Sequence, residues 1–326
     1  MLTRRLFIVA GLALSFMSLA ILPSQAKAAY PEREIRFIIP YGAGGLNDIV
    51  ARKLSDIAGQ EKLLSVPIIV TNIHGAQSRN GLNAARDAAA DGYTVLLHHT
   101  GIVANNALGQ IPNSYKDFRM VGQLMVSPPA LDVRADAKWK TIQELLADIK
   151  ANPGKIRVGV AIGSVTHVAL MNFLTHNGLP VNAVKYIPLE GGGETYAALV
   201  GKKVEFTSVQ AVSALANMRG GETRILIALT TESMPAFKGI PNLSDLGIKK
   251  SFGTRLGLFV PKGTPDEAVN TLTELLKTLA SNKTMQDFAN DRSCVLEFIG
   301  PEEWDKIYNE DYETVRAIAR EAGLIK

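Results

Sequence analysis

The sequence of 326 residues contains a single cysteine, Cys294, so no disulfide can form within the chain. The folded protein must therefore be held together by its packed cores alone. A thiol in apolar surroundings is inert, and we expect Cys294 to be buried rather than reactive.

The chain also has little net charge, with 35 basic and 31 acidic residues and a formal charge of +4. Its first 28 residues hold Arg4, Arg5 and Lys27 and no acid, so the remainder carries only +1. No stripe of Lys and Arg is interleaved with aromatic residues. The sequence therefore predicts no nucleic-acid partner.

Motifs typical of enzymes are missing as well. The turn Gly42–Gly45 lacks the Lys of a P-loop and is not a full G-x-G-x-x-G. Ser164 and His167 are neighbours without a G-x-S-x-G elbow or an orienting acid. His98 and His99 point to opposite faces of a strand and cannot easily chelate one ion, although one of them can form a hydrogen bond in a cleft. We expect no catalytic residue, metal or cofactor.

The N-terminus has the pattern of a signal peptide. Arg4 and Arg5 precede the apolar run Leu6–Leu22, and Ala26-Lys27-Ala28 forms a small-x-small cleavage site. We expect residues 1–28 to be removed during export. Two alternatives stay open, because the run is long enough for an uncleaved anchor and the paired arginines also fit a twin-arginine signal.

What the chain does contain is a repeated device, in which a strand runs into a Gly/Ser/Thr-rich turn that opens a helix. The device occurs at Pro40–Asp48, Ile162–His167 and Leu189–Glu194, with a related turn at His98–Gly101. Each turn leaves backbone N–H groups unpaired at the positive end of a helix dipole. Several such turns that converge on one cleft would bind a small anion, most readily a carboxylate.

Strand-like and helix-like segments alternate from Glu34 to Leu97 and again from Thr141 to Leu229. This alternation predicts two α/β units with mostly parallel sheets and flanking helices. Two amphipathic segments near the C-terminus, Glu267–Leu279 and Pro301–Ala322, are not needed to complete the second unit and can pack on the first.

The expected organisation is therefore a discontinuous domain 1, residues 29–128 and 253–326, and a domain 2, residues 129–252. The chain would cross between the domains near Ser127–Asp132 and near Phe252–Leu258. Since no Pro/Ser-rich linker separates the halves, the short crossings are typical of a hinge.

A series of motifs, each weak alone, matches one family in order and spacing. They are Tyr30-Pro31, Ile35–Gly45 with Asp48, Val70–Asn72, Gly75-Ala76, Asp91–Thr94, Pro153–Lys155, Gly163–His167, Gly257–Pro261 and Gly263–Pro265. Through them the mature chain resembles the periplasmic solute-binding components of tripartite tricarboxylate transporters, also called Bug-type receptors.

The resemblance implies a two-domain fold of the type II periplasmic-binding-protein class, a Venus flytrap. Such a receptor captures a small organic anion, usually a carboxylate, between its domains and delivers it to the permease subunits of the transporter. We expect a monomeric periplasmic protein that is not an enzyme. The alternatives are a periplasmic hydrolase and a ligand sensor that docks on a signalling partner.

The same resemblance implies a set of cleft residues. Carried over position by position, they are Tyr41, Gly42, Ala43, Gly45, Asp48, Gly75, Ala76, Ser78, Thr100, Gly163, Ser164, Thr166, Gly191 and Gly192. His167, at a helix start, is a further candidate for ligand contact or for capping. Asp48 also fits an ordinary first-turn residue that interacts with the helix dipole.

Several cleft-side positions depart from the family pattern. Arg79 replaces a small or amide residue, Arg255 an aromatic residue and Glu190 a lysine, and Val209-Gln210 replaces an Asp-Asn pair. Arginine on a cleft-side loop can bind a carboxylate bidentately, so Arg79 and Arg255 become candidate ligand-binding residues. We favour Arg255, which lies beside the second crossing; alternatively, both are surface charges or Arg255 pairs with Glu190.

Overall fold

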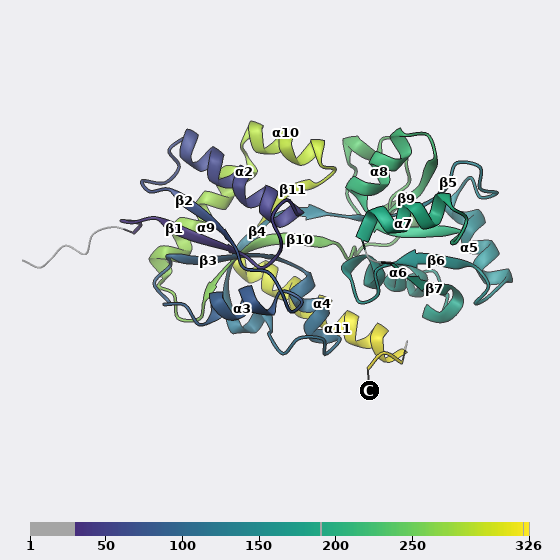
Figure 1. Ribbon diagram of the computed structural model, residues 1–326, viewed down its shortest axis with the longest axis horizontal. Coiled ribbons are helices and arrows are strands. Elements are labelled where there is room, and N and C mark those ends of the chain that lie inside the picture. The colour runs from purple at the N-terminus through teal and green to yellow at the C-terminus, as the bar shows by residue number, and fades with distance from the viewer. Residues whose placement is uncertain (1–29, 190, 322, 326) are drawn as a thin grey trace, which may run out of the picture.

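The computed structural model describes residues 30–189, 191–321 and 323–325, arranged as two α/β lobes along the long axis (Figure 1). The predicted signal peptide and Glu190 lie outside these ranges. Within them, no helix has the length and apolar character needed to cross a lipid bilayer.

The first lobe is built on a six-stranded sheet with the order β11-β4-β10-β3-β1-β2. Its strands are β1 (Ile35–Ile39), β2 (Ile68–Asn72), β3 (Thr94–His99), β4 (Phe118–Ser127), β10 (Thr254–Pro261) and β11 (Val295–Ile299). Its helices are α2 (Leu46–Gln60), α3 (Arg79–Arg86), α4 (Gly101–Ala107), α9 (Asp266–Ala280), α10 (Lys283–Asp291) and α11 (Pro301–Glu321).

Successive side chains of β1 point to opposite faces of this sheet and pack into two separate cores. Phe37 packs with the apolar sides of α2, α9 and α10, whereas Ile38 packs with α3, α4 and α11. Helix α2 shows why these residues form a helix, because Val50, Leu54 and Ile57 recur on one buried face. Cys294 is 2 % exposed in the first of these cores, which confirms its predicted burial.

The second lobe is built on a five-stranded sheet with the order β7-β6-β8-β5-β9. Its strands are β5 (Pro129–Arg134), β6 (Arg157–Val160), β7 (Lys185–Pro188), β8 (Phe206–Gln210) and β9 (Thr223–Ala228). Its helices are α5 (Ile142–Ala151), α6 (Val165–His176), α7 (Gly191–Val200) and α8 (Ala211–Arg219). Helices α5 and α6 cover one face, and α7 and α8 contribute to separate clusters.

Two α/β units with flanking helices were expected and are observed, but both sheets are mixed rather than mostly parallel. β1 pairs in parallel with β2 and β3, and β6 with β7 and β8. Every pair that involves β4, β5 or β10 is antiparallel. These are the strands beside the connections between the lobes, where the chain returns without a crossover helix.

The two connections lie side by side. The first runs from β4 to β5 through Pro128, and the second leads from the second lobe into β10. Ser127 and Thr254 face one another in the β4–β10 register. Gln210 ties them together, since Ser127 Oγ donates to Gln210 Oε1 at 3.2 Å and Gln210 Nε2 donates to Thr254 Oγ1 at 2.8 Å. The exact domain boundaries given above stay a prediction.

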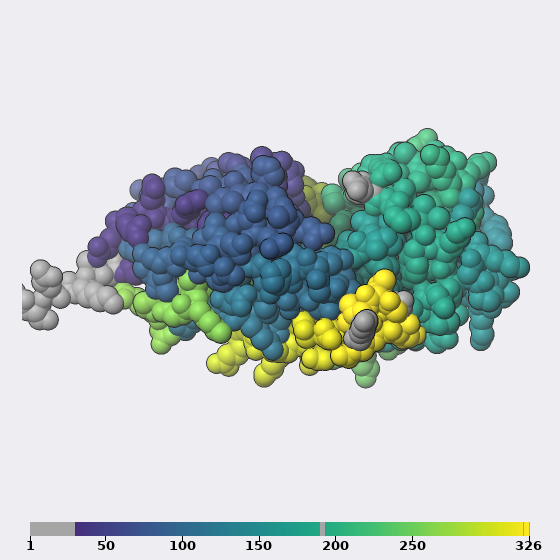
Figure 2. Space-filling model, turned by 60° about the horizontal axis from the view of Figure 1, so that its bottom comes forward, coloured from purple at the N-terminus to yellow at the C-terminus, as the bar shows by residue number. Residues whose placement is uncertain are grey.

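Helix α11 adds a third link. Trp304 and Tyr308 near its start are fully buried in the first lobe, whereas Val315 and Ile318 belong to the core of the second lobe. Figure 2 shows this helix, in yellow, against both lobes.

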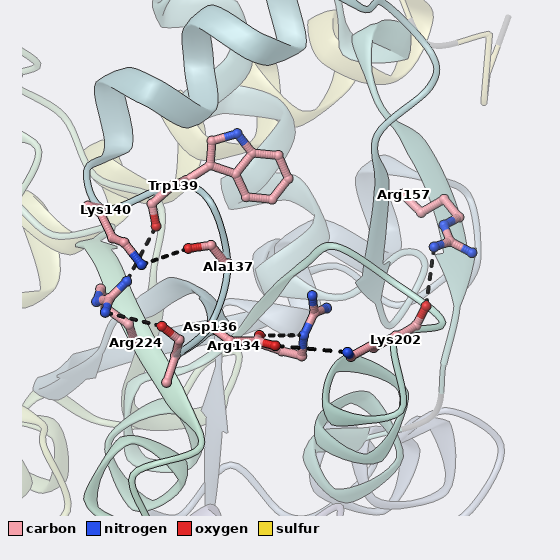
Figure 3. A network of polar contacts seen from close by, with 9 residues as sticks. Arg134, Asp136, Ala137, Trp139, Lys140, Arg157, Lys202 and Arg224 are labelled. Atoms are coloured by element: carbon pink, nitrogen blue, oxygen red, sulfur yellow. Dashed lines mark hydrogen bonds and ion pairs between the residues drawn. The ribbon is translucent and has the colours of Figure 1, made fainter.

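Polar contacts hold the loops at one end of the second lobe, opposite the turns that follow β6 and β8 (Figure 3). Arg224 donates to the carbonyl of Ala135 at 3.2 Å, and Arg134 donates to Asp136 at 2.9 Å. Arg157 donates to the carbonyl of Lys202 at 3.2 Å. These basic residues therefore already have partners and hold loops in place.

The close approach of α11 to the sheet depends on Gly257. A Cβ at this position would lie 2.3 Å from the carbonyl oxygen of Gly122 and 2.3 Å from the Trp304 ring. We expect Gly257→Ala to lower the free energy of unfolding by about 1–3 kcal/mol or more through overpacking, measured by thermal or urea denaturation.

The matched control is Gly59→Ala in α2, where no described atom lies within 4 Å of the added Cβ. This variant should be as stable as the wild type or gain up to about 1 kcal/mol from helix propensity. Equal stability of the two variants would contradict the described packing of α11.

Candidate functional site

A cavity of about 500 Å³ lies between the lobes. The first lobe lines it with Tyr41, Gly45, Leu46, Asn47, Gln77, His99, Gly101, Asn105, Gln110 and Thr254. The second lobe lines it with Ile162, Gly163, Ser164, Val165 and Gln210. Most of these residues lie in the turns after β1, β2 and β6, at the ends of β3 and β8, or in the first turns of α2, α4 and α6, so the ends of strands from both sheets meet at one place.

Three helices of at least nine residues begin at this cavity. Gly45 precedes α2, Ser164 precedes α6 and Gln210 precedes α8. These three residues have the extended backbone conformation that is typical of an N-cap. Because the N-cap residue Gly45 has no side chain, it leaves the first N–H groups of α2 without a side-chain cap. Their N–H groups and dipoles give this part of the cleft a positive potential without a charged residue.

Asn47 adds a side-chain donor at the start of α2. The residue is 4 % exposed and lines the cavity. Its Nδ2 has no hydrogen-bond partner among the described residues. Because buried polar groups nearly always have partners, this amide is available for a ligand or for ordered water.

An aromatic wall forms where β1 and β3 end. The Tyr41 ring stacks on His99 with the centroids 5.0 Å apart and the planes 10° apart, and Tyr41 Oη lies 3.2 Å from His98 Nε2. The Gly101 N–H donates to His99 Nδ1 at 2.8 Å. Burial lowers the pKa of His98 to about 4 and that of His99 well below its usual range, so both rings are neutral near pH 7.

The turn after β2 has an unusual backbone. Ala76, Gln77 and Ser78 have φ values of 47°, 55° and 72°, the left-handed region that side chains disfavour. Each such residue costs about 1–3 kcal/mol, and such strain clusters at binding sites. The turn places Gln77 at the cavity and buries Ser78 behind it, with Ser78 Oγ 3.5 Å from His98 Nε2.

The turn after β6 is held by its own side chains. The Ser164 hydroxyl accepts the His167 N–H at 3.3 Å and lies 2.9 Å from Thr166 Oγ1. The Gly163 N–H donates to His167 Nδ1 at 3.1 Å, and burial lowers the pKa of His167 to about 4. His167 therefore orders the turn from behind as a neutral acceptor.

Gln110 connects the two lobes across the cavity. It follows α4 in the first lobe, yet a Cβ on Gly163 would lie 2.4 Å from its Nε2. Gly163 also has φ of 79°. The second lobe thus uses glycine here because the turn needs left-handed backbone and because the Gln110 amide fills the space.

The predicted cleft residues fall into three groups. Tyr41, Gly45, Gly163 and Ser164 line the cavity. Asp48, Ser78, Thr100, Thr166 and His167 are buried beneath its wall and are absent from the described lining. Gly42, Ala43, Gly75 and Ala76 in the adjoining turns and Arg79 at the start of α3 are likewise outside that lining, while Gly191 and Gly192 begin α7.

Asp48 and Thr100 have structural partners. The Asp48 carboxylate accepts the Gly44 N–H at 2.9 Å and forms an ion pair with Arg52 at 2.9 Å, which holds its pKa below its usual range. Thr100 Oγ1 donates to the Gly253 carbonyl and accepts the Arg255 N–H, both at 2.9 Å. Asp48 therefore fixes the first turn, and Thr100 fixes the second crossing.

Neither candidate arginine reaches the cavity. Arg79 is exposed at the start of α3, and the Arg255 side chain faces a different cavity, because Thr254 points into the cleft and successive residues of a strand face opposite sides. The favoured placement of Arg255 in the cleft therefore has no support in the geometry. Glu190, its suggested partner, lies outside the described residues.

Sequence reasoning missed most of the polar lining. The missed side chains are Asn47, Gln77, Asn105 and Gln110, whereas His99 was one of two possible cleft histidines and Gln210 a noted departure from the family pattern. Asn47 lies within the predicted turn Pro40–Asp48 and Gln77 directly follows the motif Gly75-Ala76, so an amide in or beside a glycine-containing turn was the available signal. No Lys, Arg, Asp or Glu occurs in the described lining, and no group of three metal-binding side chains occurs in the described ranges.

Comparisons with known proteins agree with this geometry. A family model described as the tripartite tricarboxylate transporter family receptor matches residues 50–324. The chain is 32% identical over 337 residues to the UPF0065 protein in the gbd 5'region of Cupriavidus necator, with 99% of each chain covered. It is 26% identical over 300 residues to BugT of Bordetella pertussis, with 90% of each covered. A solved TctC solute binding protein from Polaromonas has a TM-score of 0.79 and 28% identity over 90% of this chain and 99% of that one.

The neutral histidines predict a flat pH profile for ligand binding. With the pKa of His98 at about 4 and that of His99 well below 6.5, neither gains a proton between pH 6 and 8. A carboxylic acid with a pKa of about 4 stays ionised over the same interval. We therefore expect its affinity, measured by calorimetry, to be constant from pH 6 to 8. A marked gain in affinity toward pH 6 would mean that a histidine acts as a cation in the cleft.

Proposed function

Because the chain belongs to the tripartite tricarboxylate transporter receptor family, a family of periplasmic solute-binding proteins, we propose that it captures a small organic carboxylate in the interlobe cavity. The resemblance to Bug-type receptors and the type II fold class are confirmed by these relatives. In this proposal residues 1–28 direct export, and the monomeric receptor delivers its ligand to the permease subunits of a tripartite tricarboxylate-type transporter.

The observation that carries the proposal is the buried Asn47 amide. Its Nδ2 lacks a partner among the described residues and lies at the start of α2, where Gly45 and Leu46 also line the cavity. A carboxylate oxygen would accept from this amide and from the adjacent N–H groups at once. A hydrogen bond to a charged group contributes about 1.5–3 kcal/mol, so a few of them bind an anion without a salt bridge.

The apolar part of the cavity fits the carbon skeleton of such an acid. Ile162 is 44% exposed and lies in the lining together with Leu46, Val165 and the Tyr41 ring. An exposed isoleucine at a cleft gains stabilisation when a ligand covers it. The amides of Gln77, Asn105, Gln110 and Gln210 surround this patch and can bind further oxygens of the ligand.

Both lobes supply binding groups, which favours a flytrap mechanism. Asn47 belongs to the first lobe, and Ser164 and Ile162 belong to the second. A ligand that touches both lobes binds the closed state more tightly than an open one and shifts the population toward it. The paired crossings at Ser127 and Thr254 are the proposed hinge.

The alternative of a hydrolase finds little support. Ser164 Oγ caps α6 and contacts Thr166, while His167 Nδ1 accepts the Gly163 N–H. No hydrogen bond joins the Ser164 and His167 side chains in the described structure. A general base must reach the nucleophile it activates, so this pair orders the turn instead.

The central test removes the unpaired donor. The cognate acid is first identified by mass spectrometry of small molecules that co-purify with the protein. We expect Asn47→Ala to weaken its binding about ten- to a hundred-fold in calorimetry, because one hydrogen bond to a charged group is lost. Asn47→Asp should weaken binding further, since it places a negative charge beside the carboxylate.

The matched control is Asn290→Ala on the exposed side of α10, which should leave affinity unchanged. Circular dichroism establishes that each variant is folded. Wild-type affinity in Asn47→Asp would remove the α2 N-terminus from the site and overturn the proposed binding mode.

A further inference from the structure

A second cavity, of about 370 Å³, lies on the other side of β10. It is lined by Asn172 and His176 of α6, by Thr231, by Lys249–Phe252 and Arg255, and by Ile307, Glu310, Asp311 and Thr314 of α11. Its walls therefore come from helices of both lobes. Thr254, the residue before Arg255 in β10, lines the cavity between the lobes instead. The two cavities therefore lie on opposite sides of this strand and are separate.

The floor of this cavity holds an arginine with spare donors. Arg255 Nη2 donates weakly to the Ser251 carbonyl at 3.3 Å, whereas the buried Nε has no hydrogen-bond partner in the described structure. The backbone of Arg255 is fixed by Thr100 through its N–H, and its carbonyl accepts a hydrogen bond from Tyr308 Oη at 3.3 Å. These bonds fix the backbone of Arg255 in β10, although the N–H donors of its planar guanidinium group are largely unused.

A carboxyl group with no partner faces it from α11. Asp311 is 9 % exposed, and its Oδ2 lacks a hydrogen-bond partner among the described residues. Burial raises the pKa of Asp311 to about 7, although the charge of Arg255 acts in the opposite direction. A buried carboxylate without a partner is costly, so such a group needs an explanation.

The two groups do not satisfy each other. No ion pair within 4.0 Å joins Arg255 to Asp311 in the described chain, although both line the same cavity. At the rim, Lys250 and Glu310 form an ion pair with each other. Lys249, also in the lining, forms no ion pair among the described residues. The cavity therefore presents two cationic side chains, Arg255 and Lys249, and the carboxyl group of Asp311, whose charge interacts with that of Arg255.

We propose that this cavity is a second small-molecule site, which takes a small zwitterion with a carboxylate and an ammonium group, the chemistry of an α-amino acid. The carboxylate accepts hydrogen bonds from the unused donors of Arg255, with Lys249 nearby. The ammonium group donates to the Asp311 carboxylate. One molecule thus satisfies both buried groups, and a cavity of about 370 Å³ is within the usual range for small ligands.

The position of the site has a mechanical consequence. A molecule held between Arg255 of β10, α11 and α6 contacts both lobes behind the second crossing. Its binding is therefore coupled to the relative orientation of the lobes, and reciprocally to ligand binding in the cleft.

The test uses L-alanine as the probe, with propionate and ethylamine as analogues that each carry one of its two charges. In calorimetry we expect saturable binding of L-alanine to the mature protein. Neither analogue should bind at the same concentration to the Asn47→Asp variant, in which the damaged cleft no longer takes a carboxylate. Arg255→Gln and Asp311→Asn should each weaken L-alanine binding at least tenfold, because each removes a charged partner. Thr314→Met, which fills the cavity from α11, should do the same without a change of charge.

Two controls separate this site from the cleft and from general effects of charge. Glu313→Gln removes a charge from the exposed side of α11 and should bind L-alanine normally. Asn47→Asp, expected to damage the cleft, should also bind it normally. Thermal denaturation establishes that each variant is folded.

The proposal is overturned by an absence of saturable L-alanine binding at millimolar concentrations, which would mean that water fills the cavity. It is equally overturned by binding that survives all three cavity variants or that is lost in Asn47→Asp, since the probe would then occupy the cleft. An absence of L-alanine binding leaves the proposed carboxylate binding in the cleft untouched, whereas its loss in Asn47→Asp would support a carboxylate site there.

Discussion

The structure depends on the way in which its two chain crossings are tied together. Gln210 accepts from Ser127 and donates to Thr254, and Thr100 holds Gly253 and the backbone of Arg255. Because these bonds keep the crossings side by side, the turns of both sheets face each other across one cavity. Helix α11 spans the opposite side, with its start in one core and its end in the other. The site thus exists only as a consequence of the connection between the lobes.

Charge is kept away from the described cleft lining. Asp48 is neutralised by Arg52, Arg79 is exposed, and Arg255 faces away from the cleft. What remains there is a set of N–H groups, amides and hydroxyls with the neutral ring of His99. Such donors bind an anion through several moderate contacts that all require the correct position, which suits a receptor that must also release its ligand.

Two of the three predicted turns, Pro40–Asp48 and Ile162–His167, contribute to the described cavity lining, whereas Leu189–Glu194 does not, and most of the side chains around the cavity were not predicted. Gly45, Gly163 and Ser164 line the cavity because a glycine-rich turn before a helix has few possible geometries. Gln77 and Gln110 follow no spacing rule, since their positions depend on a strained turn and on contact across the lobes. Strands β4 and β5 were not predicted, because β4 is buried on both faces and shows no alternation. Arg255 was placed in the cleft although the strand alternation that brings Thr254 there turns Arg255 away.

The central claim is that a small carboxylate draws the two lobes together about the paired crossings. Small-angle X-ray scattering of the mature protein, with and without the acid that co-purifies with it, tests this claim most directly. The account predicts that the radius of gyration decreases at saturating ligand, because the ligand contacts both lobes and favours the closed state. A scattering profile that does not change at saturation would contradict it.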